Sequence, residues 1–300
     1  MAKKRKVRKV ICVVSILLVL AVGITFAVMK MLFPGMAFAK SVSFSNVTAS
    51  VDKFTYQPEK IEKGTVYHYV KSNMDNSKPA NVAVFIGADD HLEVFKIYPG
   101  ANATFFVTAD FSWDIFSPNA LNGYEIYKNM EKKLVMHSSW SKENDTFTYS
   151  DSKGDYSVPI GHYPLHNFNF DLTSLNYTFR HLTDPESTFN IGVHYPSFNP
   201  ITFIKFVYTG EAVVRYISDE TYNQKLCRKY EISGEGMRNK KGYIWVNKEG
   251  GYFENIEIPL SDNPSWNSFK LTLAGMEKMS GEEWSEYVTG QSKEYFADKK

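Results

Sequence analysis

The stretch that decides the fold is residues 64–100, which read GTVYHYVKSNMDNSKPANVAVFIGADDHLEVFKIYPG. It contains three runs of alternating or wholly apolar character, at Tyr67–Val70, Asn81–Ile86 and His91–Tyr98. The last two runs flank Gly87-Ala88-Asp89-Asp90, which is a hairpin signal. Short runs of this kind between turn residues indicate antiparallel strands.

The same pattern continues toward the C-terminus. Further runs stand at residues 104–108, 134–140, 146–150, 189–193, 202–208, 212–217, 225–233, 242–247, 252–258 and 268–274. Regular spacing without alternating helices favours one large antiparallel system over a parallel α/β fold. The predicted fold class is mostly β: a large antiparallel sheet or open half-barrel with one or two short helices, preceded by an N-terminal transmembrane helix.

Two segments predict the helices. Leucine and phenylalanine side chains recur at helical spacing over residues 172–182, with Asp171 placed to cap the first turn. Ser280-Gly281-Glu282-Glu283 has the form of a capping box and predicts a second helix at the C-terminus.

The N-terminal residues predict export. Residues 1–9 form a basic tail, and Val10–Met29 is an uncharged run long enough to cross a bilayer as a helix. The positive-inside rule places the tail in the cytoplasm and the domain at 41–300 in the periplasm or outside the cell. We favour a single-pass anchor over residues 10–32. A signal peptide cleaved after Ala39 is the alternative, because Ala37-Phe38-Ala39 is a small-residue site.

Composition and motifs exclude several function classes. Without the tail, the chain carries 28 basic and 33 acidic side chains, so no nucleic-acid partner is predicted. His162 and His166 flank Pro164 and would lie about 13 Å apart in an extended chain, too far to share one ion. Gly234-Glu235-Gly236 lacks the remainder of a dinucleotide motif. We predict no metal, no cofactor and no catalytic residue.

One constellation points to a ligand. Several apolar strand faces carry a single cation, and an unpaired charge in a dry core would cost several kcal/mol. We predict a concave wall whose cations hold the anionic head group of an amphipathic, lipid-like ligand or a lipidated partner. The predicted ligand-binding residues are Lys71, Lys96, Lys205, Arg215, Arg228, Tyr230 and Glu254.

Two other interpretations of these residues stay open. A bulge would turn the cations outward. Alternatively, Glu254 pairs with Arg228 or Arg215 inside the domain.

Several short motifs support a resemblance. Residues 67–73 (YHYVKSN), 91–96 (HLEVFK), 169–172 (NFDL) and 179–182 (FRHL) with Asp184-Pro185 resemble a group of uncharacterised bacterial envelope proteins. So do residues 227–230 (CRKY), 242–245 (GYIW), and Trp266 with 269–271 (FKL). The resemblance implies a bacterial source and no particular activity. The order of strands is more loosely similar to the half-barrels of periplasmic lipoprotein carriers.

Three functions therefore remain for testing. The first is an envelope protein that binds an amphipathic ligand or a lipidated partner. The second is a structural or protein-interaction module that assembles through sheet edges or aromatic patches, with its protein partners not specified by the sequence. The third is a hydrolase of envelope polymer, which would need two acidic residues in one groove.

Overall fold

The computed structural model of the chain describes residues 47–199 and 203–299. Its main sheet joins fifteen strands in the order β11-β12-β13-β14-β15-β16-β17-β2-β3-β4-β5-β6-β7-β8-β9. All neighbours in it are antiparallel except β11 and β12, and β1 pairs separately with β10. The predicted large antiparallel sheet is confirmed.

The strands have the following bounds: β1 Thr48–Ala49, β2 Thr65–Ser72, β3 Ala80–Ala88, β4 His91–Ile97, β5 Thr104–Ser112, β6 Ser117–Ile126, β7 Lys132–Ser141, β8 Thr146–Asp151, β9 Gly154–Pro159, β10 His162–Tyr163, β11 Leu165–Asn167, β12 Phe189–Asn199, β13 Phe203–Tyr222, β14 Lys225–Ser233, β15 Gly242–Asn247, β16 Phe253–Ile258 and β17 Phe269–Lys278.

Every run named from the sequence overlaps a strand within the described residues, but β6 and β9 escaped the pattern. β6 contains Pro118, Asn119 and Gly123, which are typical of turns, and its neighbours β5 and β7 hold it in the sheet. β9 is a short edge strand that ends in Pro159. The described residues of the runs at 202–208 and 212–217 belong to one strand, β13, which continues through Gly210 at a φ of +115°.

Both predicted helices are present. α3, Gly281–Ala297, begins at Ser280 with the predicted capping box. α2, Thr173–Thr178, lies between the 3-10 turns Phe168–Phe170 and Phe179–His181. The predicted cap is wrong, because Leu172 occupies the N-cap position and no side chain caps it. Asp171 instead adopts a left-handed conformation, with a φ of +55°, and its carboxylate binds lysines on the sheet.

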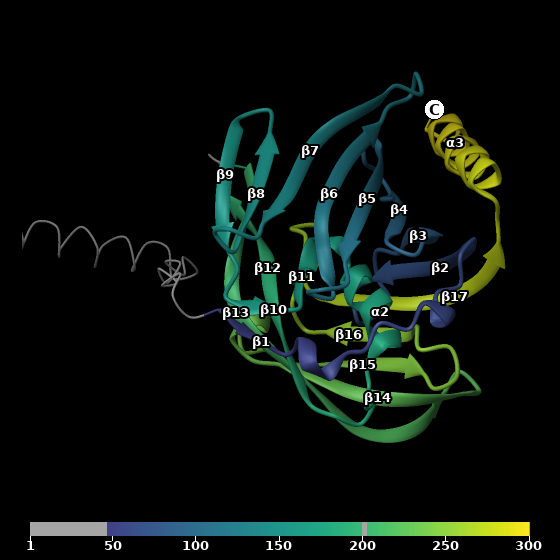
Figure 1. Cartoon of the computed structure of the whole chain (residues 1–300). Helices are drawn as coiled ribbons and strands as arrows, with labels where there is room; N and C mark the ends of the chain where they lie inside the picture. Colours follow the sequence, from purple (N-terminus) through teal and green to yellow (C-terminus); the bar gives the residue numbers. More distant parts are fainter. Residues whose placement is uncertain (1–46, 200–202, 300) are drawn as a thin grey trace, which may run out of the picture. The chain divides into compact units, whose positions relative to one another are not determined.

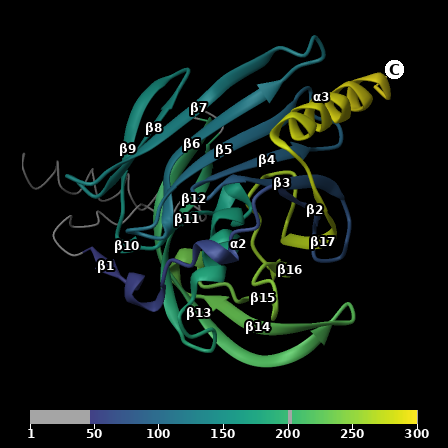
Figure 2. The ribbon, with the colours of Figure 1, turned by 45° about the vertical axis from the view of Figure 1, so that its right-hand side comes forward.

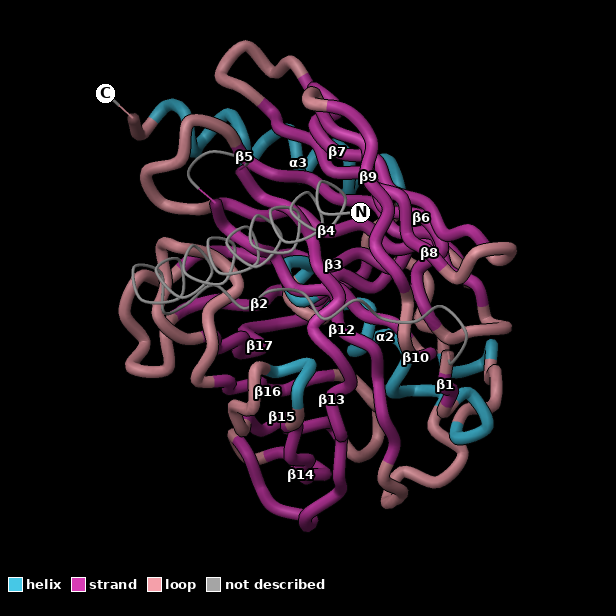
Figure 3. The backbone as a smooth tube through the Cα atoms, turned by 90° about the vertical axis from the view of Figure 1, so that its left-hand side faces the viewer, coloured by secondary structure: helices cyan, strands magenta, loops and turns pink. Residues whose placement is uncertain are grey.

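The sheet curves around α2, which lies within its concave side (Figure 1). Figure 3 shows the long strands β12 and β13 running side by side. Every residue of α2 is buried, and so are Phe168, Phe170 and Leu172 just before it. These side chains belong to one apolar cluster with the inward residues of the strands. The concave side is therefore packed with the chain's own segment 168–182.

α3 covers part of the opposite, outer face of the sheet, beside β2, β3 and β4 (Figure 2). A second apolar cluster joins Trp284 and Val288 of α3 to Val66, Phe85 and Phe95 of the strands. Trp284 stacks on Phe85 with ring centroids 5.2 Å apart. The sheet thus has two separately packed faces.

Within residues 47–199 and 203–299, no helix has the length and apolar character needed to cross a bilayer. The predicted tail at 1–9, the anchor at 10–32 and the cleavage site at Ala39 lie outside the described residues. They stay predictions.

Candidate functional site

The structure brings two of the predicted cations together on the inner face. Lys71 of β2 and Lys96 of β4 are 1% and 4% exposed, as expected from the apolar residues that alternate with them. Lys71 Nζ lies 2.7 Å from an Asp171 carboxylate oxygen and 2.6 Å from Asp262. Lys96 pairs with the other Asp171 oxygen and donates to the Asn169 carbonyl at 3.2 Å. Two resident acids therefore neutralise these two lysines.

Electrostatics within this cluster stabilise the charged forms of Lys71 and Asp171. Burial by itself lowers the pKa of Lys71, but Asp171 and Asp262 outweigh it and hold that pKa well above its usual value. Burial likewise opposes ionisation of Asp171, and Lys71 and Lys96 overcome this effect and lower its pKa. Asp262 differs, because burial and the neighbouring Asp171 raise its pKa to about 6.

The predicted orientation of Lys205 and Arg215 is wrong. Both side chains are exposed on the outer face of β13, while Phe206 and Val214 point into the core. The Arg215 side chain is 56% exposed and pairs with Glu231 at 3.3 Å. The phase was misjudged because apolar residues stand at both odd and even positions of this strand. Lys205 Nζ lies 5.0 Å from the centroid of the Tyr156 ring.

The remaining predicted residues lie apart from the Lys71–Lys96 cluster. Arg228 of β14 is half-buried and donates to the Lys248 carbonyl at 3.2 Å. Tyr230 is buried and its hydroxyl donates to the Pro185 carbonyl. Glu254 is buried and pairs with Lys225 at 3.0 Å, so the expected pairing with Arg228 or Arg215 is wrong. The seven residues do not converge on one ligand site, and their role in binding stays a prediction.

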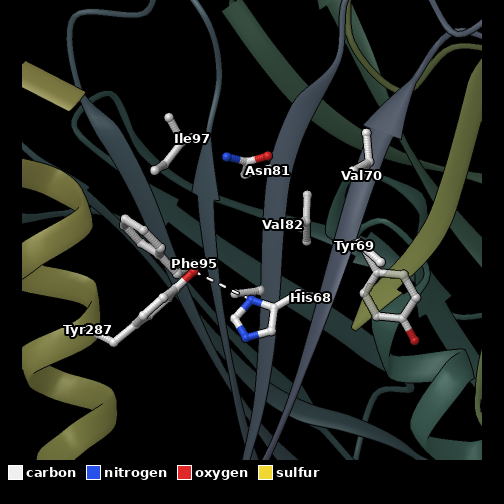
Figure 4. A pocket seen from close by; sticks show the side chains of 10 residues that line it. His68, Tyr69, Val70, Asn81, Val82, Phe95, Ile97 and Tyr287 are labelled. Carbon is white, nitrogen blue, oxygen red and sulfur yellow. Dashed lines mark hydrogen bonds between the residues drawn. The ribbon is translucent and has the colours of Figure 1, made fainter. Parts of the chain in front are cut away.

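A pocket of about 210 Å³ lies instead on the outer face, between the sheet and α3 (Figure 4). Polar and apolar groups share its wall about equally, and His68, Asn81 and Tyr287 supply polar side chains. Ten residues line it: His68, Tyr69, Val70, Asn81, Val82, Ala83, Phe95, Ile97, Ala274 and Tyr287.

Strand alternation explains which residues of β2 reach this pocket. His68 and Val70 face outward, whereas the Tyr69 ring points away toward α2, where its hydroxyl donates to the Phe253 carbonyl. Tyr287 enters from α3, stacked on Trp284 and edge-on to Phe95. The pocket escaped the sequence analysis because its walls come from β17, three consecutive strands and a helix almost 200 residues further along the chain.

A chain of polar contacts borders the pocket. His68 Nε2 lies 2.6 Å from Glu277 of β17, and His68 Nδ1 lies 3.5 Å from the Tyr287 hydroxyl. Burial raises the pKa of Tyr287, and Glu277 adds to that effect, so the hydroxyl stays protonated at neutral pH. The arrangement offers hydrogen bonds beside an apolar surface.

Other chemistries find little support in the described part of the chain. No group of three or more His, Cys, Asp or Glu residues there is placed to hold a metal ion. Asp171 and Asp262 approach the same lysine, but both are fully buried and do not face a groove. His166 is buried against Ser174, 2.8 Å from its hydroxyl, and the free Cys227 is buried with a pKa raised by burial to about 11.

Comparison with known proteins gives little further information. No protein-family model and no curated protein matches the chain. Among solved structures, a provisionally assigned outer membrane lipoprotein-sorting domain from Vibrio parahaemolyticus is 9% identical, with a TM-score of 0.22, over 78% of this chain and 94% of that one. A provisionally assigned exported protein with a YmcC-like fold from Bacteroides fragilis is 13% identical, with a TM-score of 0.25, over 75% of this chain and all of the other. Similarity at this level carries no argument about function.

Proposed function

We propose that this protein is an exported envelope β domain that binds an amphipathic ligand, whose apolar part enters the pocket between the sheet and α3. The observation that carries the proposal is the pocket itself, where apolar side chains such as Phe95 and Ile97 lie beside three hydrogen-bonding side chains. Small-molecule sites commonly combine a mainly apolar lining with a few placed polar groups.

The size of the pocket limits what it holds. An apolar cavity of about 150 Å³ is large enough for benzene, and this one has about 210 Å³. The site therefore suits one alkyl or isoprenoid chain end, with the rest of the ligand outside. Two bulky chains would not fit together.

The outer face suits such a ligand better than the inner face. Segment 168–182 fills the concave side, and Asp171 and Asp262 already neutralise Lys71 and Lys96. Removing that segment would expose much of the core, whereas a chain end enters the outer pocket without moving a buried element.

Site-resolved photolabelling tests the proposal. The full chain in lipid nanodiscs is exposed to a decyl probe with a diazirine at its chain end, and labelled peptides are mapped by mass spectrometry. We expect labelling of peptides that contain Val70, Ile97 or Tyr287, because these residues line the pocket. Ala274→Trp should weaken this labelling by at least about ten-fold, since the indole fills the pocket; this factor corresponds to about 1.4 kcal/mol.

The matched control is Met276→Trp. Met276 lies two residues further along β17 and is exposed, but it does not line the pocket. Its labelling pattern should equal that of the unaltered chain. Labelling that is unchanged by Ala274→Trp, or that maps mainly to other strands, would show that the pocket is not the binding site.

A further inference from the structure

We infer that the pocket selects a neutral, hydrogen-bonding head group, such as a hydroxyl or an amide, over an anionic one. This inference rests on the proposed function and names the class of ligand for the same site. It departs from the sequence-based expectation that cations hold an anionic head group.

The charges around the pocket support this selection. None of the ten lining residues is a lysine, an arginine, an aspartate or a glutamate. Glu277 brings a negative charge into contact with one of them: its carboxylate accepts from His68, and its side chain is 50% exposed. A carboxylate or phosphate head group placed beside His68 would meet this negative charge and no lining lysine or arginine. Like charges at short distance repel, and an ion also loses hydration at the pocket mouth.

The polar groups complement a head group that both donates and accepts. A carboxylate only accepts hydrogen bonds, so His68 Nε2 carries the proton in its contact with Glu277. His68 Nδ1 lies 3.5 Å from the Tyr287 hydroxyl, which can donate to it. The Tyr287 oxygen keeps its own acceptor capacity, and its ring is fixed by stacking on Trp284.

Asn81 is a second polar group at the pocket that can bind such a head group. Its side chain is exposed, lies between Val70 and Ile97 at the pocket (Figure 4), and has no hydrogen-bond partner among the described residues. An amide group both donates and accepts. A hydroxyl or amide on the ligand can therefore donate to the Tyr287 oxygen, or both donate to and accept from Asn81, whereas a carboxylate can only accept, and the free donor that it meets is Asn81.

The experiment compares competitors in the photolabelling assay. 1-Decanol and decanoate have the same chain length, and at about pH 8 the acid is fully ionised. We expect 1-decanol to suppress labelling at the pocket at a concentration at least about five-fold lower than that of decanoate. Each competitor also partitions into the bilayer, so the decisive quantity is how the ratio of the two competing concentrations changes between variants.

Two variants shift this ratio for different reasons. Tyr287→Phe keeps the ring but removes the hydroxyl. It should raise the concentration of 1-decanol that suppresses labelling by roughly two- to ten-fold, and it should change the corresponding concentration of decanoate little. Glu277→Gln removes the negative charge and should lower the concentration of decanoate that suppresses labelling, relative to that of 1-decanol. The Met276→Trp control should leave the ratio unchanged.

The outcomes separate the two proposals. Labelling that depends on Ala274, together with equal or stronger competition by decanoate, would overturn the inference and leave the proposed function standing. A ratio that neither Tyr287→Phe nor Glu277→Gln alters would also overturn the inference. Loss of site-specific labelling in every form of the chain would overturn the proposed function itself.

Discussion

The inner and outer faces of the sheet differ in how their polar side chains are paired. On the inner face, Lys71 and Lys96 are buried and fully matched by Asp171 and Asp262. On the outer face, α3 covers only part of the strands and leaves a pocket whose polar side chains are His68, Asn81 and Tyr287. The difference shows that a buried cation on an apolar strand does not by itself indicate a ligand, because a distant segment of the same chain supplies the anion.

Lowering the pH should have the largest effect on stability, through histidines packed on the inner side. Burial lowers the pKa of His166 to about 3, and that of His181 and His194 to about 4. The unfolded chain therefore binds more protons between about pH 6.5 and 4, and stability falls across this window by roughly 1.4 kcal/mol per pH unit for each histidine.

Asp262 acts in the opposite sense, because its pKa of about 6 exceeds that of an unfolded aspartate. The folded chain then holds the extra proton between about pH 6 and 4, which favours folding in acid. Three histidines outweigh one carboxyl, so the net change is destabilising. Denaturant unfolding at a series of pH values measures it, and a free energy of unfolding that increases from pH 7 to about pH 5 would contradict this balance.

Asp171→Asn should have the next largest effect. It leaves Lys71 with Asp262 and removes the one charged partner that Lys96 has among the described residues, so we expect a loss of about 3–5 kcal/mol in the free energy of unfolding. Asp89→Asn is the matched control, because its pair with Lys63 is exposed on both sides and should cost less than about 1 kcal/mol. Equal losses in the two variants would contradict the special role of the inner cluster.

Trp284→Phe tests whether the outer face is packed separately. The introduced phenyl ring can still stack on Phe85, but the indole hydrogen bond to Glu93 is lost. This loss should lower the free energy of unfolding by about 1–3 kcal/mol. Hydrogen exchange should become faster in α3 while the amides of α2 keep their protection. Loss of protection in both helices at once would mean that the faces unfold as one unit.

Arg215→Ala should have the smallest effect, since the Arg215–Glu231 pair lies at the surface. We expect less than about 1 kcal/mol by the same unfolding measurement. Lys205→Ala should also cost little, because this side chain is exposed. A loss of several kcal/mol in either variant would restore the inward orientation that the sequence first suggested.

Local patterns predicted most of the fold because strand and capping signals depend on neighbours in the sequence. Tyr67, Tyr69 and Lys71 alternate with outward residues, so their shared inner face could be identified. Lys205 and Arg215 could not be placed, because β13 has apolar residues on both faces and alternation then loses its meaning. A strand such as β6, with turn-forming residues, is held by its neighbours and gives no local signal.

The candidate site depended on contacts that no local pattern contains. Asp171 has the position of a helix cap in the sequence, yet its partner Lys71 lies 100 residues away. Tyr287 meets His68 across 219 residues. The sequence alone determined the kind of most elements, because hydrophobic period and turn chemistry act over a few residues. Only the tertiary structure decided which charges are neutralised and where a pocket stays open, because both depend on side chains brought together by the curvature of the sheet.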